Sequence, residues 1–288
     1  MYRRSTREIF KNSKDIGSYL GVCFEITGHT ELGKESIFFD TDIHYIDKGK
    51  GQPILFIHGI GQSLYTWRKS IDIFARNGYR VLAVDLAGFG YSGHPNIYYT
   101  PEEYALIIKA FLDTLGIDKV NIAAFSTGCL SAICLAAANP ERIGKLIFVS
   151  PGAPNSEYLF TMRFLTTWLG YNLFRLHLTE SSVRKILLEM YFDSTLVTDD
   201  VIDNYFRPFL NKDVRETLAM CMAHFDDAYP KSLLRGIKHD TLIFSGADDK
   251  IHNENMIIQY TRPMPNATHI RLRNCSHLLH EEKYAKFN

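Results

Sequence analysis

The feature that most constrains the fold is the alternation of short apolar segments with helical segments between residues 35 and 150. The apolar segments have the sequences PILFIHG, RVLAVDLAG, KVNIAAFS and KLIFVSPG, and segments with helical patterning, such as SLYTWRKSIDIFARNG, lie between them. Short continuous apolar strands that alternate with helices are typical of a parallel sheet covered on both faces. The sequence therefore predicts an α/β fold with a mostly parallel, doubly wound sheet, preceded by a hairpin in IFFDTDIHYID.

One of these helices can be placed from its end signals. In TPEEYALIIKAFLDTLG, Thr100 suits the N-cap, Pro101 suits the first helical position, and Glu103 stands where its side chain can return to the cap amide. Gly116 suits the position after the last turn. The sequence predicts a helix that begins after Thr100 and ends before Gly116.

The pattern changes after Gly152. Residues 153–239 hold two of the chain's 19 glycines but four of its seven methionines, and helical segments such as SSVRKILLEMYF and DVRETLAMCMAHF dominate. The strand pattern then resumes in DTLIFSGADD and ATHIRLRNCSH. We therefore expect a helical cap over 153–239, inserted between two parts of one core at 35–152 and 240–288, with an N-terminal extension over 1–34.

The composition indicates a soluble globular protein and disfavours several partners. Lysine plus arginine and aspartate plus glutamate each number 32, so the formal net charge is zero, whereas nucleic-acid binding needs a basic excess. No stretch approaches the roughly 20 apolar residues of a membrane span. The five cysteines are scattered and odd in number, which favours reduced thiols in the cytoplasm over a disulfide framework.

The first 14 residues carry a net charge of +4, from five basic residues and one acidic residue. No apolar stretch of the kind found in a secretory signal follows them. A solvated tail is the simpler interpretation, and an arm on a membrane surface is the alternative. We expect a cytoplasmic protein without stable membrane insertion and without a nucleic-acid partner, and no sequence feature indicates an oligomeric state.

The sequence around Ser126 carries the main chemical signal. In NIAAFSTGCLSAICLAAANP an apolar strand runs into a small-residue helix with almost no room for a loop, and Ala124 and Gly128 stand two residues to either side of the serine. A serine on so sharp a turn is strained and exposes its hydroxyl at the carboxyl edge of the sheet. The alternative is a serine that only begins a helix. The pattern resembles the nucleophile elbow of the α/β-hydrolase family, with Ala124 in place of the first glycine of G-x-S-x-G.

The resemblance implies an acid and a histidine after the serine, in that order along the chain. TLIFSGADDKI contains an apolar strand, a glycine and an acid three residues later, which favours Asp249 over its neighbour Asp248. LRNCSHLLHEE follows a further strand and places His277 at the family's histidine position, with His280 as the rival and Glu282 five residues after His277. Asp249 and His277 are therefore the candidate acid and base.

An oxyanion formed at a carbonyl carbon needs backbone N–H donors. The resemblance implies that one donor is the amide of Thr127, and that the other lies in HGIGQS after the strand PILFI, at Ile60. Gly59 and Gly61 permit a tight turn there, and His58 is expected to be structural. Surface or structural roles are also expected for the histidines outside these motifs, which are His239, His252 and His269.

Two other kinds of site are disfavoured. Gly88, Gly90 and Gly93 match G-x-G-x-x-G, but a dinucleotide motif must open a helix, and HPNIYYT with Pro95 follows instead. The string DLAGFGYS is similar to a loop common in α/β-hydrolases. The acidic pairs at 199–200 and 226–227 lack ligand spacing with histidine or cysteine, so we expect no metal and no cofactor.

The resemblance implies a serine hydrolase that cleaves carboxylic esters through an acyl-enzyme, using Ser126, His277 and Asp249. A serine at this position disfavours haloalkane dehalogenases and epoxide hydrolases, which use aspartate there. Carbon–carbon, thioester, lactone and N-terminal peptide hydrolysis with the same triad are alternatives, as is a non-catalytic ligand-binding protein of this fold. The cap is expected to select a small, uncharged and partly apolar acyl substrate, with Phe164 and Trp168 as candidate binding residues.

Overall fold

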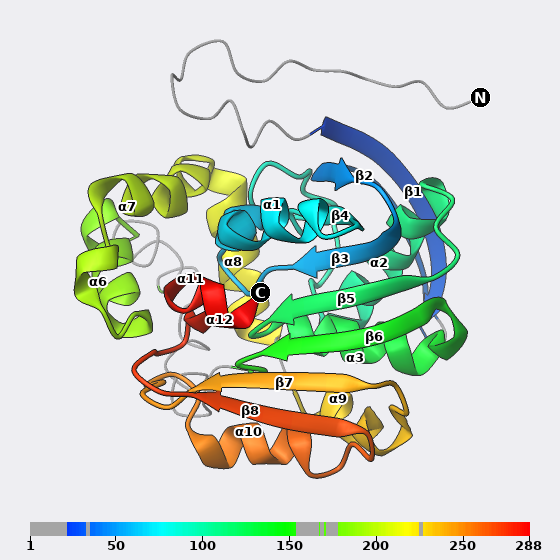
Figure 1. Cartoon of the computed structure of the whole chain (residues 1–288). Coiled ribbons are helices and arrows are strands. Elements are labelled where there is room, and N and C mark those ends of the chain that lie inside the picture. The colour runs from blue at the N-terminus through cyan, green and yellow to red at the C-terminus, as the bar shows by residue number, and fades with distance from the viewer. Residues whose placement is uncertain (1–21, 33–34, 154–166, 168–169, 171–177, 225–226) are drawn as a thin grey trace.

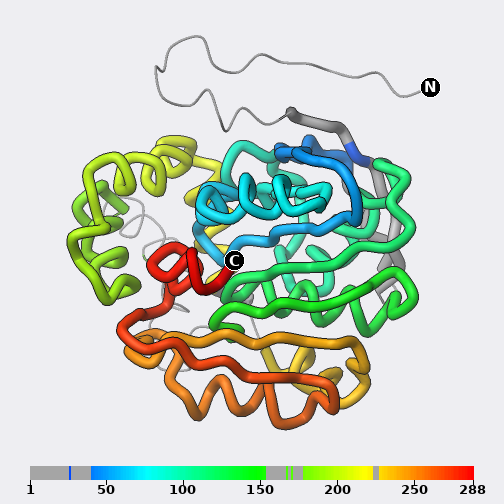
Figure 2. The backbone as a smooth tube through the Cα atoms, in the orientation of Figure 1, coloured from blue at the N-terminus to red at the C-terminus, as the bar shows by residue number. Residues whose placement is uncertain are grey.

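The computed structural model describes residues 22–32, 35–153, 167, 170, 178–224 and 227–288, and an eight-stranded sheet forms its centre (Figure 1; Figure 2). The strand order is β1-β2-β4-β3-β5-β6-β7-β8. The pairs β1–β2 and β2–β4 are antiparallel and every other pair is parallel, which confirms the predicted sheet. The strands are β1 (Val22–Leu32), β2 (Glu35–Gly49), β3 (Gln52–Ile57), β4 (Tyr79–Val84), β5 (Val120–Phe125), β6 (Ile143–Val149), β7 (Thr241–Gly246) and β8 (Ala267–Leu272).

The antiparallel edge differs from the sequence prediction in two respects. β1 lies within residues 1–34, so the sheet begins inside the segment that we expected to be an N-terminal extension. The segment IFFDTDIHYID does not form a hairpin by itself but belongs to the single strand β2. β2 pairs with β1 on one side and with β4 on the other, as in the partners Ile26↔Thr41 and Tyr45↔Val84. Its mixed alternation therefore reflects one long strand with two different neighbours.

Helices lie on both faces of the sheet. In Figure 1, α1 (Arg68–Arg76), α11 (Leu279–Glu282) and α12 (Tyr284–Phe287) lie on the face turned toward the viewer, and α2 (Pro101–Thr114) and α3 (Gly128–Ala138) lie behind it. α2 begins as predicted, because the Thr100 hydroxyl accepts from the Glu103 amide at 3.3 Å and the Glu103 carboxylate accepts from the Thr100 amide at 3.0 Å.

The segment expected to be the cap contains four described α-helices. In Figure 1, α6, α7 and α8 gather beyond the arrowheads of the central strands, and so lie at the carboxyl edge of the sheet. The remaining helices, with the short 3₁₀ turns, are α6 (Glu180–Met190), α7 (Asp199–Phe206), α8 (Lys212–His224), α9 (Ala228–Leu233), α10 (Glu254–Thr261), η1 (Leu64–Trp67), η2 (Pro140–Arg142), η3 (Ser194–Leu196), η4 (Arg207–Leu210) and η5 (Leu234–Gly236).

The core is closely packed where α3 lies against the central strands. Every residue of β5 is buried, as are Gly128 to Ala136 of α3. A Cβ atom on Gly128 would lie 2.3 Å from the carbonyl oxygen of His58, just after β3. Glycine at the start of α3 therefore lets the helix approach the sheet closely at the point where β5 ends.

The loop after β4 folds around a buried carboxylate. The side chain of Asp85 accepts from the amides of Leu64 at 2.7 Å and Tyr91 at 2.9 Å, and its Oδ2 lies 2.7 Å from Nδ1 of His44. Burial alone would raise the pKa of Asp85, but His44 and the amide donors hold it below its ordinary value. Of the glycines in G-x-G-x-x-G, Gly90 lies against this carboxylate, and the next described helix begins only at Pro101, so the motif does not open a helix.

Replacement of Gly90 tests this loop. Gly90 has φ of 57°, and an added Cβ would lie 2.2 Å from Cγ of Asp85, whereas Gly116 has φ of 64° with nothing within 4 Å of its added Cβ. We expect Gly116→Ala to lower the free energy of unfolding by about 1 kcal/mol from backbone strain, and Gly90→Ala to lower it by about 3 kcal/mol or more. Urea unfolding measures both, and equal losses would contradict the steric account.

Candidate active site

Ser126 stands on a strained turn between β5 and α3. Its φ is 52°, in the left-handed region that only a few described non-glycine residues adopt. Its amide donates to the Val149 carbonyl at 2.8 Å and its own carbonyl accepts from Cys129 at 3.1 Å. An added Cβ on Gly59 would lie 3.1 Å from Cβ of Ser126, so a larger residue would crowd the turn. The sharp turn predicted from the small residues is present.

The structure brings together the three side chains that the sequence singled out. Nε2 of His277, in the loop after β8, lies 3.2 Å from Oγ of Ser126, and its Nδ1 lies 2.9 Å from Oδ2 of Asp249, in the loop after β7. The side chains of His277 and Asp249 are 2% and 1% exposed, so water screens this chain of hydrogen bonds little. Asp248 is exposed, and the partner of His277 is therefore Asp249.

Asp249 is held as an anion. Its Oδ1 accepts from the amides of Ile251 at 2.8 Å and His252 at 2.9 Å. Burial alone would raise the pKa of this carboxyl, but the charge and hydrogen bond of His277, together with the His252 amide, lower it to about 2. An ionised Asp249 accepts the Nδ1 proton of His277, which leaves Nε2 of His277 as an acceptor for the Ser126 hydroxyl.

The rival histidine has other partners. His280 lies on α11, fully buried, with Nε2 2.9 Å from Oγ1 of Thr66 and its ring centroid 4.6 Å from that of Trp67. Burial lowers the pKa of His280 to about 3. It is therefore a neutral residue of the core rather than the partner of the serine.

His252, for which a surface or structural role was expected, is a buried neighbour of His277. Its ring meets that of His277 edge-on, with centroids 4.8 Å apart, and its two ring nitrogens lie 2.9 Å from the Ser150 carbonyl oxygen and 3.1 Å from the Ala153 carbonyl oxygen. Burial, and then the proximity of His277, lower the pKa of His252 to about 4. The one sequence feature that relates His252 to the site is its position three residues after Asp249.

The two expected oxyanion donors lie side by side. The amide of Ile60 donates to Oγ1 of Thr127 at 2.7 Å, and Thr127 itself is the N-cap residue of α3, beside Ser126. A helix N-terminus favours negative charge. An oxyanion bound at Ile60 would replace the Thr127 hydroxyl as acceptor of its N–H.

His58 supports this turn, as the sequence predicted. Its Nδ1 lies 2.7 Å from the Gly59 carbonyl oxygen, and its Nε2 accepts from the Leu86 amide at 2.9 Å. Burial lowers the pKa of His58, which keeps the ring neutral between one acceptor and one donor.

Residues of the segment expected to be the cap pack on the loops that border the site. An added Cβ on Gly61 would lie 3.4 Å from Leu218 of α8 and 3.6 Å from Phe209, and one on Gly88 would lie 2.4 Å from Thr217 of α8. The candidate binding residues Phe164 and Trp168 lie outside the described residues, so their roles stay predictions.

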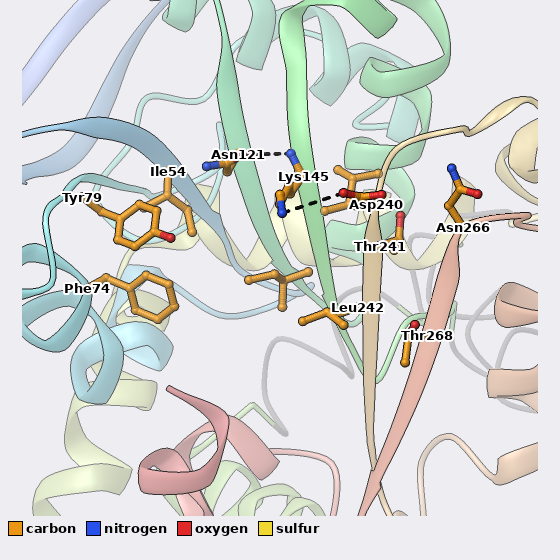
Figure 3. Close-up of a pocket in the computed structure, with 12 residues that line it drawn as sticks. Ile54, Phe74, Tyr79, Asn121, Lys145, Asp240, Thr241, Leu242, Asn266 and Thr268 are labelled. Atoms are coloured by element: carbon orange, nitrogen blue, oxygen red, sulfur yellow. Dashed lines mark hydrogen bonds and ion pairs between the residues drawn. The ribbon is translucent and has the colours of Figure 1, made fainter.

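A groove of about 400 Å³ lies away from this site (Figure 3). Its lining includes Ile54, Asn121 and Thr241, which stand at the amino ends of β3, β5 and β7, whereas Ser126 stands at the opposite edge. Ligands of parallel sheets bind at the carboxyl ends of strands. Within the described residues, no cluster of histidine, cysteine or carboxylate side chains could hold a metal ion. None of the helices described here is long and apolar enough to cross a membrane.

The chain is similar to one protein family, to named hydrolases and to solved hydrolase structures. Residues 52–284 match the family model described as the alpha/beta hydrolase fold. Over 256 residues the chain is 28% identical to a 2-hydroxy-6-oxononadienedioate/2-hydroxy-6-oxononatrienedioate hydrolase of Paraburkholderia phymatum, with 85% of this chain and 88% of that relative covered. A thermophilic esterase of Thermogutta terrifontis has a TM-score of 0.76 at 21% identity, with 92% of this chain and 94% of the esterase covered.

A meta-cleavage product hydrolase of Pseudomonas fluorescens has a TM-score of 0.72 at 23% identity, with 86% of this chain and 91% of that chain covered. At such identities the two structures show the fold alone. Because the family model spans most of the sequence, the chain belongs to the α/β-hydrolase family.

Replacement of the two adjacent aspartates tests the role of Asp249. We expect Asp249→Asn to slow the reaction of Ser126 with a fluorophosphonate by about 10³-fold or more, because the amide favours the wrong tautomer of His277. Asp248→Asn, which changes an exposed neighbour, should leave the rate within about twofold. Mass spectrometry of the Ser126 peptide over time measures the rate, and equal rates in the two variants would contradict the assignment.

The lowered pKa of Asp249 also predicts a pH dependence of stability. A carboxyl whose pKa is lower in the folded state stabilises that state fully above its unfolded value near 4, and this stabilisation is lost as the pH falls through about 2. The difference in unfolding free energy between wild type and Asp249→Asn should therefore narrow by roughly 1 kcal/mol from about pH 5 to about pH 3. Urea titrations measure it, and a constant difference would refute the prediction.

Proposed function

We propose that the protein is a serine hydrolase that cleaves a small acyl compound through a covalent acyl-enzyme. The observation that carries the proposal is the buried chain of hydrogen bonds from Ser126 through His277 to Asp249, with the serine in a left-handed conformation. A serine becomes an effective nucleophile when an adjacent base is oriented by a third group. The contacts described above support both conditions, with His277 as the adjacent base and Asp249 as the orienting group.

The roles follow from the hydrogen-bond directions. Oγ of Ser126 attacks the carbonyl carbon while Nε2 of His277 takes its proton, and the new C–O bond moves the carbonyl electron pair onto oxygen. The amides of Ile60 and Thr127 donate to that oxyanion, and Asp249 stabilises the imidazolium. When the tetrahedral intermediate collapses, the bond to the leaving group breaks and His277 delivers its proton to that group. Water then attacks the acyl carbon while His277 takes one of its protons. Collapse of this second tetrahedral intermediate breaks the bond to Ser126, returns the proton to Oγ and releases the acid.

A carboxylic ester is the bond that we propose first. An alkoxide needs one proton on leaving, and His277 holds that proton beside the reacting centre. The cap over the carboxyl edge of the sheet favours small to medium acyl groups that are uncharged and partly apolar. The expectation of a cytoplasmic protein is compatible with this proposal and remains a prediction.

A carbon–carbon bond is the second candidate, favoured by the relatives. Several relatives, at 26–29% identity, are named as hydrolases of 2-hydroxy-6-oxo-dienoates or -dienedioates, which carry a ketone and at least one carboxylate. The same serine, base and acid could act on such a ketone, with carbon as the leaving atom. The ratio of kcat/KM for p-nitrophenyl esters to that for 2-hydroxy-6-oxo-dienoates distinguishes the two bonds.

Replacement of the nucleophile tests the shared mechanism. We expect Ser126→Ala to lower kcat for the preferred substrate, with p-nitrophenyl acetate tested first, by about 10³-fold or more, and to abolish fluorophosphonate labelling. Ser131→Ala is the matched control, because Ser131 is a buried serine of α3 whose hydroxyl has no hydrogen-bond partner among the described residues. It should retain wild-type turnover.

Two results would overturn the proposal. Turnover by folded Ser126→Ala at the wild-type rate would remove the serine from the mechanism. Folded wild-type protein that hydrolyses neither substrate class and forms no adduct on Ser126 would favour a non-catalytic ligand-binding protein of this fold.

A further inference from the structure

One buried carboxylate outside the triad collects donors from both the core and the cap. Glu281, on α11, has a side chain only 1% exposed, and its Oε2 lies 2.6 Å from Nη2 of Arg68 on α1. Its Oε1 accepts from Oγ1 of Thr66 at 2.9 Å. Burial alone would raise the pKa of Glu281, but Arg68 holds it below its ordinary value, so this group is an anion paired with a cation.

The cap supplies two further donors to the same carboxylate. The hydroxyl of Tyr191, at the end of α6, donates to Oε2 of Glu281, and the hydroxyl of Tyr205, on α7, donates to Oε1. Burial raises the pKa of both phenols, so they keep their protons and act as donors. Hydrogen bonds to a charged group are about twice as strong as neutral ones, so Glu281 is a strong link between two cap helices and the core.

The segment that holds Glu281 also holds the base. His277 stands four residues before Glu281. Leu278 directly follows His277, and its amide donates to the Met190 carbonyl, at the end of α6, at 3.2 Å. Glu282 accepts from the Ser276 amide at 2.6 Å and from the Phe192 amide, just after α6, at 2.7 Å. The end of α6 is therefore bonded to the loop of His277 on both sides of the histidine.

From this arrangement we propose that Glu281 is a positioning residue that, through Tyr191 and Tyr205, joins the cap to the loop of His277 so that cap and base keep one relative position. The inference rests on the proposed function for its catalytic consequence. Its structural content, that the cap tyrosines restrain His277, stands on the contacts alone. A displacement of His277 by about 1 Å would be enough to slow a proton transfer by about 10²-fold.

The effect is testable without a variant that leaves an unpaired charge. Removal of Glu281 or Arg68 would leave the charge of the other residue buried without a partner, which would destabilise the folded state. The double variant Tyr191→Phe/Tyr205→Phe instead removes two hydroxyls and keeps both rings. Tyr260→Phe is the matched control, because its hydroxyl donates at 2.7 Å to a carboxylate, Asp227, that also pairs with a lysine, but outside the loop of His277.

The main measurement is the exchange with water of the His277 Nδ1 proton, followed by NMR of the folded protein and assigned by its loss in His277→Gln. We expect exchange to be about tenfold faster in the double variant than in wild type, and unchanged in Tyr260→Phe. In steady-state assays with the ester or dienoate that the wild type hydrolyses, kcat should fall by about tenfold with KM within about twofold. Urea unfolding records the stability loss of each variant.

The outcomes separate the two proposals. Equal proton exchange in wild type and double variant, with Ser126-dependent turnover intact, would overturn the positioning role and leave the proposed function standing. Faster exchange in the double variant of a protein that hydrolyses no substrate would support the positioning role and overturn the proposed function. A loss of stability alone, matched by Tyr260→Phe and without a change in exchange, would show that the cluster only stabilises the fold.

Discussion

The left-handed backbone of Ser126 is the constraint on which the rest of the site depends. Such a conformation costs about 1–3 kcal/mol and persists only where the surrounding structure enforces it. Here the Val149 carbonyl on β6 fixes the serine amide, and Gly59 and Gly128 allow the turn after β3 and the start of α3 to approach on the other side. The strained turn is thus held by contacts at the ends of β3, β5 and β6, which are neighbours at the centre of the sheet.

Around that turn, three buried carboxylates each fix one loop at the carboxyl edge of the sheet. Asp85 organises the loop after β4, Asp249 the loop after β7, and Glu281 the segment after β8. Each one accepts hydrogen bonds from backbone amides or hydroxyls and faces a basic side chain. Because a buried charge is costly when any partner is lost, each loop has one strongly favoured arrangement. Hydrogen-bonded carboxylates therefore hold the loops at the edge of the sheet, whereas packing of apolar side chains holds its centre together.

Local signals made much of the fold and the site predictable. The strand that runs into a small-residue helix marked Ser126, and the strand ends before Asp249 and His277 marked its partners, because residues at the ends of parallel strands converge in space. Contacts between distant segments were not predictable in this way. Glu281 meets Tyr191 across 90 residues of chain. β1 was missed because an antiparallel edge strand carries a weaker pattern than a buried parallel strand.

The close approach of Gly88 to Thr217 has a consequence for how this fold can diversify. Gly88 has φ of 80°, and an added methyl group would overlap Thr217 of α8, so the loop after β4 and the cap helix are shaped to each other. A side chain larger than threonine at position 217 would meet the backbone of that loop at the same point. Cap and core are therefore not freely exchangeable modules, and inherited changes in selectivity are expected to arise as paired changes in α8 and residues 85–93.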